Sequence, residues 1–369
     1  MKIGVLTSAR ADFGIYTPLL NSLKEDEFFD LEIIAFGTHL SKFHGYTVDY
    51  IEDQGFAVYH KITSLLVNDN PNSIATSYAL TSLKFADFWE ECFDTYEYVF
   101  CLGDRFEMAA AVNAGIPYGI RFAHIHGGDT TLGAIDNIYR HQISLASKLH
   151  FVAIPNHADR VKELVGNEGI VEVVGSLSLE NISGFKLLSK QEFWEVWKID
   201  LSMPTILVTV HPETVGYEQN EFFAQETYAA IFDLVNDYQV IITLPNADTS
   251  GTLYRECFEK LGNELGKKIH LVENFGTRSY FTCMKYCNLL FGNSSSGIIE
   301  AASFEKYVIN IGDRQMGRAH GKNVVNVPFE RNELVNAVKL YATRKFDGKN
   351  LYDQGGAVKK IILTLKTHQ

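Results

Sequence analysis

Short apolar runs that are hydrophobic on both faces recur along most of this 369-residue chain and alternate with stretches of helical period. A strand that is apolar on both faces is typical of a parallel sheet covered by helices on both sides. In the first half, the expected strands are residues 2–9, 31–37, 96–103, 120–127, 149–154 and 170–175. In the second half, they are residues 205–210, 239–244, 268–273, 289–292 and 307–312. Helical patterns lie between them, for example at residues 16–25, 75–92, 220–236 and 297–304. Repeated β-α units of this kind predict a doubly wound α/β fold.

The series of strands and helices restarts after a polar, charged segment at residues 187–200. We therefore expect a change of domain between residues 173 and 202, and two doubly wound domains with a cleft between them. Ligands of such sheets bind beyond the carboxyl ends of the strands. Polar residues that follow a strand are therefore the candidates for the functional site.

Charge and cysteine content exclude several classes of protein. The net charge of −12 disfavours nucleic acid as a partner, because an acidic surface repels a phosphate backbone. No apolar run approaches the roughly 18 residues of a membrane span, so no membrane partner is expected. The five cysteines are few, scattered and odd in number, which favours a reduced, cytoplasmic protein. No second Cys/His pair accompanies Cys283 and Cys287, so no metal site is expected.

The strongest anion-binding pattern lies at residues 292–297, where a strand ending in Gly-Asn is followed by three serines and a helix. Backbone N–H groups at a helix start and serine hydroxyls suit phosphate oxygens. One serine would satisfy helix capping, so three in a row favour a ligand. The predicted phosphate ligands are Ser294, Ser295, Ser296 and Gly297. Glu300 could accept hydrogen bonds from ribose hydroxyls, or simply be a favourable first-turn carboxylate.

Titratable side chains follow two strands of the first half. Asp104 and Arg105 come directly after a buried run, where Asp could act as acid or base and Arg could clamp a phosphate. The alternative is an Asp helix cap beside an exposed Arg. His124 and His126 alternate on one expected strand, and histidine titrates near neutrality, which favours proton transfer there. Asp136 and Arg140 have the spacing of an ordinary helix ion pair.

Two common nucleotide motifs are absent from the sequence. There is no G-x-x-x-x-G-K-S/T loop, and no G-x-G-x-x-G follows the first strand. The second absence disfavours a nicotinamide-dependent dehydrogenase.

Ten sequence blocks in order resemble the hydrolysing UDP-N-acetylglucosamine 2-epimerase family of sialic-acid and legionaminic-acid synthesis. They are TSARADFG, GTHLSKFHGYT, GDRFE, HIHGGD, IDNIYRH, HPET, LPNADTSG, GNSSSGIIE, GDRQMGR and LYDQGGAV. The resemblance extends from residue 3 to about residue 365. It implies a glycosyltransferase-B-like fold with two Rossmann-like domains and a central cleft. Residues 1–172 with a returning C-terminal helix at 353–369 would perform the sugar chemistry, and residues 173–352 would bind the nucleotide. A homodimer is also implied.

The resemblance further implies a reaction on a UDP-sugar. The C2 proton is removed, UDP leaves from C1 to give a 2-acetamidoglycal, and water adds to release UDP and N-acetylmannosamine. No metal or redox cofactor is implied. The alternatives are the same reaction on UDP-2,4-diacetamido-2,4,6-trideoxy-glucose, a non-hydrolysing 2-epimerase, a glycosyltransferase of this architecture, and a non-catalytic nucleotide-sugar sensor.

The resemblance assigns roles by position. Asp104 and Asp136 match catalytic carboxylates, and Arg10 and Arg105 match cations suited to the phosphates. His211 matches a catalytic histidine near the diphosphate and the sugar. Ser294 and Ser295 match phosphate-binding serines, and Glu300 matches a ribose-binding glutamate. Asn246 and Arg318 fall in blocks that face the expected cleft.

The chain departs from the family pattern at two places. Where the family usually reads His-Ile-Glu-Gly-Gly-Glu, this chain has His126 in place of a catalytic glutamate and Asp129 at the last position. The role of the glutamate could persist in His126 or shift to Asp129, or the change could reflect a different sugar. The second departure is Gly175-Ser176-Leu177, where a proline is common.

Overall fold

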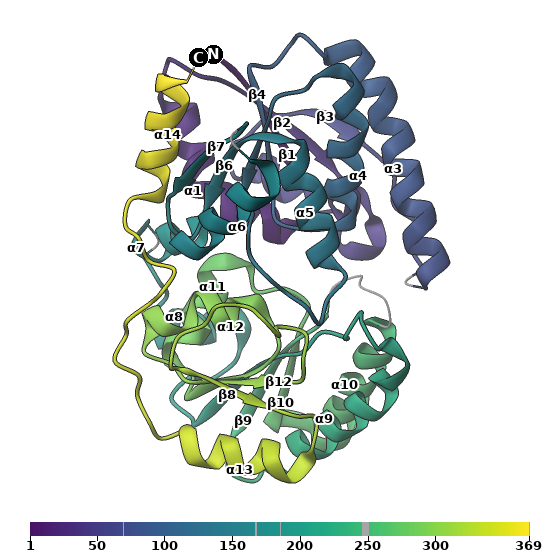
Figure 1. Ribbon diagram of the computed structural model, residues 1–369. Helices are drawn as coiled ribbons and strands as arrows, with labels where there is room; N and C mark the ends of the chain where they lie inside the picture. Colours follow the sequence, from purple (N-terminus) through teal and green to yellow (C-terminus); the bar gives the residue numbers. More distant parts are fainter. Residues whose placement is uncertain (69, 167, 185, 246–250, 369) are drawn as a thin grey trace. The chain divides into compact units, whose positions relative to one another are not determined.

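The structure is a computed structural model that describes residues 1–68, 70–166, 168–184, 186–245 and 251–368. The chain divides into two compact units, each built on one parallel sheet (Figure 1). Unit 1 comprises Met1–Asp129, Asp136–Gly184 and Tyr352–Gln369, and unit 2 comprises Thr130–Ile135 and Phe185–Leu351.

The boundary between the units lies later in the chain than residues 172/173. Leu177 packs in the core of unit 1, and the Asn181 side chain donates a hydrogen bond to the Gly14 carbonyl. The segment Thr130–Ile135 belongs to unit 2, since its Leu132 N–H donates to the Met316 carbonyl at 2.8 Å. Hydrogen bonds between such distant segments leave no signal in composition or hydrophobic period.

Unit 1 holds a seven-stranded sheet in the order β3-β2-β1-β4-β5-β6-β7. Its strands are β1 (Lys2–Thr7), β2 (Asp30–Phe36), β3 (Val58–Ile62), β4 (Tyr98–Leu102), β5 (Phe122–Ile125), β6 (Ser147–Val152) and β7 (Ile170–Val173). Its helices are α1 (Arg10–Glu25), α2 (Val48–Asp53), α3 (Pro71–Cys92), α4 (Phe106–Gly115), α5 (Asp136–Ala146), α6 (Pro155–Val165), α7 (Glu180–Gly184) and α14 (Ala357–Thr367). One core packs α1 and α14 on the sheet, and a second core packs α3 and α4.

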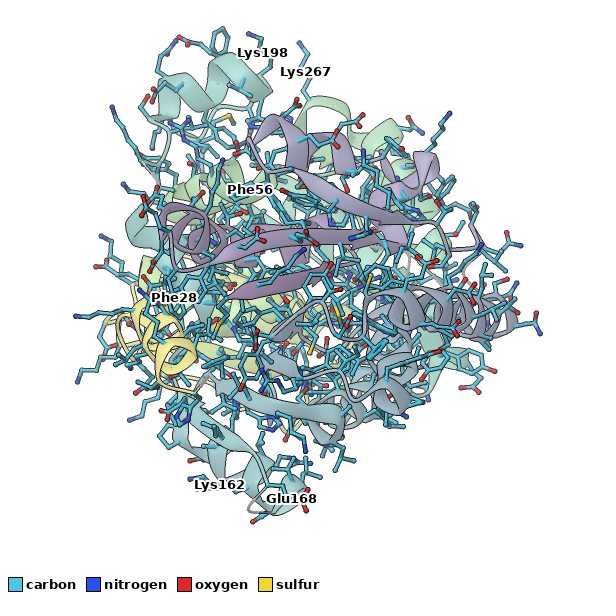
Figure 2. The ribbon with its side chains drawn as sticks, turned by 90° about the horizontal axis from the view of Figure 1, so that it is seen from above. Phe28, Phe56, Lys162, Glu168, Lys198 and Lys267 are labelled. Carbon is cyan, nitrogen blue, oxygen red and sulfur yellow. The ribbon has the colours of Figure 1, made fainter. Side chains whose placement is uncertain are left out.

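The C-terminal helix α14 is tied to the first helix and strands of unit 1. The Lys366 ammonium lies 2.6 Å from the Asp26 carboxylate and 5.3 Å from the centre of the Phe28 ring. Figure 2 labels Phe28 beside this helix, and Figure 1 shows the two ends of the chain side by side. Helix α14 therefore packs as part of unit 1.

Unit 2 holds a six-stranded sheet in the order β10-β9-β8-β11-β12-β13. Its strands are β8 (Thr205–Thr209), β9 (Gln239–Thr243), β10 (Ile269–Val272), β11 (Leu289–Gly292), β12 (Val308–Ile311) and β13 (Val324–Val327). Its helices are α8 (Lys190–Trp197), α9 (Asn220–Leu234), α10 (Gly251–Leu265), α11 (Gly276–Tyr286), α12 (Ser295–Ile299) and α13 (Arg331–Tyr341). Both sheets are parallel throughout, so the predicted fold class is confirmed.

The sequence analysis did not predict strands β3 and β13, which both lie at a sheet edge. Neither is buried on both faces along its length, so neither shows the continuous apolar run of the inner strands. Among the described residues, no helix combines the length and apolarity needed to cross a membrane.

Each sheet changes its direction of winding at one pair of neighbouring strands. In unit 1 this switch point lies between β1 and β4, and in unit 2 it lies between β8 and β11. The loops that leave the two strands of a switch point diverge and open a crevice for ligands. In unit 2 the strands approach closely at Gly292, which has φ +143° and whose added Cβ would lie 1.9 Å from the Thr209 carbonyl oxygen.

We predict that Gly292→Ala destabilises the protein by about 3 kcal/mol, because a backbone carbonyl must move and the φ is unfavourable for alanine. Urea unfolding followed by circular dichroism measures the loss. Gly184→Ala is the control, since a Cβ there meets nothing within 4 Å. Equal stability of the two variants would show that the backbones of β8 and β11 can move apart at Gly292 at little cost in free energy.

Candidate functional site

The switch point of unit 1 brings three predicted residues to one place in the sheet. Arg10 begins α1 directly after β1, and Asp104 and Arg105 follow β4, the strand that pairs with β1. Because parallel neighbours end at the same edge, both loops begin at that edge of the sheet, on either side of the crevice. The topology therefore gathers residues that are far apart in the sequence.

Asp104 is held by a buried cation. The Arg140 guanidinium, almost completely inaccessible on α5, forms an ion pair with the Asp104 carboxylate, while 28% of the Asp104 side chain stays exposed. The same guanidinium donates to the Asp129 carbonyl at 3.1 Å and to the Asn137 side-chain oxygen at 3.4 Å. The sequence indicated an Arg140–Asp136 helix pair, and the pairing with Asp104 is the finding that spacing did not reveal. A fixed cation holds the partly exposed carboxylate in one orientation, in which it can interact with a bound ligand.

Asp136, the second predicted carboxylate, is the first residue of α5 and is partly buried. It shares this helix with Arg140, one turn further along. Helix α5 therefore supplies both a carboxylate and the cation that positions Asp104.

The two predicted cations of unit 1 have different surroundings. Arg105 makes a two-point ion pair with the buried Glu107, at 2.9 and 3.2 Å. The Arg10 guanidinium lies 4.4 Å from the centre of the Tyr50 ring, and its Nε is buried with no hydrogen-bond partner in the described part of the chain. A buried donor without a partner is costly and marks Arg10 as a candidate for an anionic ligand.

Histidines 124 and 126 do not share a strand, contrary to the sequence-based expectation. Strand β5 ends at Ile125, and His126 follows it with φ +67°. His124 is fully buried, with its ring nitrogens at the Gly103 carbonyl (2.8 Å) and the Ser144 hydroxyl (3.0 Å). Burial lowers the pKa of His124 to about 3, so it is a neutral structural residue near pH 7.

His126 and Asp129 were the two alternatives for the role of the family glutamate. His126 is partly exposed, and its Nε2 accepts a hydrogen bond from the Leu177 N–H at 3.3 Å. Asp129 is buried, with Oδ1 3.4 Å from Nε2 of His157 on α6. Of the two side chains, His126 is the more accessible to a ligand.

The switch point of unit 2 is fastened by a reciprocal pair of hydrogen bonds. The His211 N–H, after β8, donates to Oδ1 of Asn293 at 2.7 Å, and Nδ2 of Asn293 donates to the His211 carbonyl at 2.9 Å. The Asn293 carbonyl also accepts from the Gln315 side chain at 2.7 Å. Asn293 therefore sets the positions of three loops, a role that its place in the predicted 292–297 pattern did not indicate.

Two of the three serines after β11, Ser294 and Ser296, form a hydroxyl cluster. Ser294 caps α12 by accepting from the Ser296 N–H, and the two hydroxyl oxygens lie 3.1 Å apart. The Ser296 hydroxyl also lies 2.6 Å from the phenol oxygen of Tyr280 on α11, whose pKa is raised by burial. Tyr280 is a further residue that the sequence analysis missed, because it lies on a helix far from any motif.

The remaining described residues that were predicted for unit 2 lie on or after α12 and in the loop after β12. A Cβ on Gly297 would lie 2.9 Å from the Val308 side chain, so this glycine permits close packing of α12 on β12. The buried Glu300 follows α12, and the expected helix over 297–304 divides there into α12 and a 3₁₀ turn, Ala301–Phe304. Arg318 donates to the Gln315 side chain at 2.9 Å. Asn246 lies outside the described residues.

A family model described as UDP-N-acetylglucosamine 2-epimerase matches residues 21–366. The chain belongs to this family. A GDP/UDP-N,N'-diacetylbacillosamine 2-epimerase (hydrolyzing) of Campylobacter jejuni is 33% identical over 345 residues, which cover 94% of this chain and 88% of the relative. A UDP-N,N'-diacetylbacillosamine 2-epimerase (hydrolyzing) of Legionella pneumophila is 30% identical over 367 residues, which cover 99% and 96% of the two chains.

A solved structure of the UDP-GlcNAc 2-epimerase from Neisseria meningitidis, bound to UDP-GlcNAc, is similar to this chain in fold. The TM-score is 0.80 at 17% identity, with 100% of both chains covered. The resemblance in the ten sequence blocks is thus confirmed as membership of the epimerase family.

Unit 1 contains three buried histidines, His39 after β2, His124 on β5 and His150 on β6. Burial lowers the pKa of His39 and of His150 to about 4, and that of His124 to about 3. His150 on β6 is paired in register with His124 on β5. In the unfolded chain these side chains bind protons below about pH 6.5, whereas in the folded protein they stay neutral until pH 4 or lower.

We predict that stability falls as the pH drops from 6.5 toward 4, because protons bind the unfolded state first. Each histidine contributes a slope of up to about 1.4 kcal/mol per pH unit. His150→Leu should remove about 1 kcal/mol per pH unit of the dependence between pH 6 and pH 5, measured by urea unfolding. The control is His368→Leu, which removes an exposed imidazole. An unchanged slope of unfolding free energy against pH in His150→Leu would contradict the prediction.

Proposed function

We propose that the protein is a hydrolysing 2-epimerase that converts a UDP-linked 2-acetamido sugar into UDP and the free manno-configured sugar. Membership of the epimerase family over nearly the whole chain carries this proposal. The location of the predicted residues at both switch points supports it, because ligands of doubly wound sheets bind there.

We further propose UDP-2,4-diacetamido-2,4,6-trideoxy-glucose, the UDP-N,N'-diacetylbacillosamine of the relatives' descriptions, as the substrate. The Campylobacter and Legionella relatives, at 33% and 30% identity, are both described as hydrolysing epimerases of this sugar. UDP-N-acetylglucosamine is the second candidate, and the description of the family supports it.

The reaction proceeds in two stages. First, a base removes the C2 proton, the C1–C2 double bond forms, and the C1–oxygen bond to UDP breaks with its electrons leaving on the diphosphate. Second, water adds its oxygen to C1 of the glycal and a proton is delivered to C2 from the opposite face. An oriented carboxylate and a stabilised leaving group are the requirements of the first stage.

We assign the C2 base to Asp104, since its carboxylate is partly exposed and fixed by the buried Arg140. We assign the proton transfers of the second stage to Asp136, on the same helix as Arg140. Asp129 is assigned a positioning role, because its carboxylate is buried beside His157. Unit 1 would thus supply the sugar chemistry.

Each unit, taken by itself, offers candidate phosphate ligands at its own switch point. In unit 2 these are the loops of His211 and Arg318, the hydroxyl cluster of Ser294 and Ser296, and Ser295 between these two serines. In unit 1, Arg10 offers a buried donor without a partner, whereas the charge of Arg105 is matched by Glu107. Glu300 is assigned to the ribose hydroxyls. The homodimer implied by the resemblance stays a prediction, which analytical ultracentrifugation tests.

The function is tested by incubating the protein in heavy water with UDP-N,N'-diacetylbacillosamine, its GDP analogue and UDP-N-acetylglucosamine. Proton NMR should show free UDP and a manno sugar that carries deuterium at C2. An epimerised UDP-sugar without net UDP release would indicate the non-hydrolysing reaction. Turnover without C2 exchange would reject the elimination route, and binding without turnover of any sugar would support a sensor.

We predict that Asp104→Asn lowers the rate of C2 exchange by about 10³-fold, since an amide cannot take the proton. UDP binding, measured by calorimetry, should be retained, because the nucleotide is assigned to other residues. Asp87→Asn, on the exposed side of α3, removes a carboxylate away from the site and should exchange like the natural chain. Full exchange activity in Asp104→Asn would move the base to another residue.

A further inference from the structure

The two departures from the family pattern contact one another. The Leu177 N–H donates to Nε2 of His126 at 3.3 Å, and the Ser176 hydroxyl oxygen lies 3.4 Å from the same nitrogen. The histidine that replaces the glutamate thus meets the segment in which a proline is common. All three residues belong to unit 1.

The segment that contacts His126 is fixed by its own surroundings. Leu177 is fully buried in the core of unit 1 and begins a 3₁₀ turn, Leu177–Leu179. The Ser176 N–H donates to the Tyr352 carbonyl at 2.9 Å, and its hydroxyl oxygen lies 3.0 Å from that of Ser178. The donor that faces His126 therefore has a defined position.

The backbone donor determines which nitrogen of His126 carries the proton. A backbone N–H can only donate, so Nε2 must offer its lone pair. A neutral imidazole has one protonated nitrogen, which is then Nδ1. His126 also holds φ +67°, an uncommon conformation for a residue other than glycine that is often found at functional sites.

We propose that Leu177 and Ser176 hold His126 in the Nδ1–H form, so that it donates a hydrogen bond to an oxygen of the nucleotide sugar and does not remove the C2 proton. The catalytic part of this inference rests on the proposed function, whereas the part on the proton position does not. Leu177 and Ser176 are positioning residues, which act through the imidazole. The glutamate of the family pattern is in this way replaced by a donor, and the base remains a carboxylate.

A proline at position 177 would delete the donor with little other change in the backbone. Proline is tolerated at the first position of a helical turn and after a residue in extended conformation, and Ser176 has φ −79° and ψ 124°. Leu177→Pro removes the N–H together with part of the leucine side chain. Leu177→Ala also shortens the side chain and keeps the N–H, so it is the matched control.

The proton position is tested by nitrogen-15 NMR of the histidine side chains at pH 7.5, with His126→Asn identifying the signals of His126. In the natural chain and in Leu177→Ala, Nδ1 should be protonated and Nε2 unprotonated. In Leu177→Pro the ring should become a mixture of both forms. A protonated Nε2 in the natural chain, or identical spectra for Leu177→Pro and Leu177→Ala, would overturn the inference.

The catalytic role is tested by C2 exchange in His126→Asn and His126→Ala. The asparagine side chain keeps an N–H donor close to the position of Nδ1, is well tolerated at positive φ, and is no base. Asparagine should therefore keep exchange within about tenfold of the natural chain, and alanine should lose more. Equal losses of about 10³-fold in both variants would identify His126 as the base and overturn the donor role.

The two outcomes separate this inference from the proposed function. If the natural chain releases no nucleotide from any sugar of the panel, the proposed function fails and the donor role fails with it. The spectra still decide whether Leu177 sets the proton position of His126, because they require no substrate.

Discussion

Parallel strands that are buried on both faces constrain every other feature of this protein. Such strands all point the same way, so their carboxyl ends meet at one edge of the sheet and their polar residues are confined to the loops beyond it. Where the winding reverses, at β1/β4 and β8/β11, two of these loops separate. Arg10, Asp104, His211 and Ser294 all lie in or beside these loops, which explains how residues spread over the chain form two compact groups.

Buried polar groups hold the side chains and loops of the candidate site in position at the ends of these strands. Arg140 brings its charge from α5 to Asp104, and Asn293 ties the loops after β8, β11 and β12 together through both its side chain and its carbonyl. Burial favours keeping such contacts intact, because breaking one would leave a polar group unpaired in the interior, which is costly in free energy. The candidate ligand-binding residues are thus held in place by other, buried residues.

His126 shows how one substitution changes the chemistry that a loop can perform. A carboxylate only accepts hydrogen bonds, whereas a neutral imidazole accepts at one nitrogen and donates at the other. In this chain the Leu177 N–H already occupies the accepting nitrogen. The interpretation of His126 therefore depends on a segment about fifty positions later in the chain, which contacts it only in the folded protein.

The sequence by itself determined the fold class and the family, because strands buried on both faces and ten ordered blocks are local patterns that need no tertiary information. It also placed Asp104, His211 and the three serines after their strands. It missed the edge strands β3 and β13, whose partial exposure breaks the apolar run. Only the tertiary structure decided that Arg140 pairs with Asp104, that Tyr280 meets Ser296 and that Leu177 contacts His126. These are contacts between distant segments, and no local period or motif encodes which buried groups will meet.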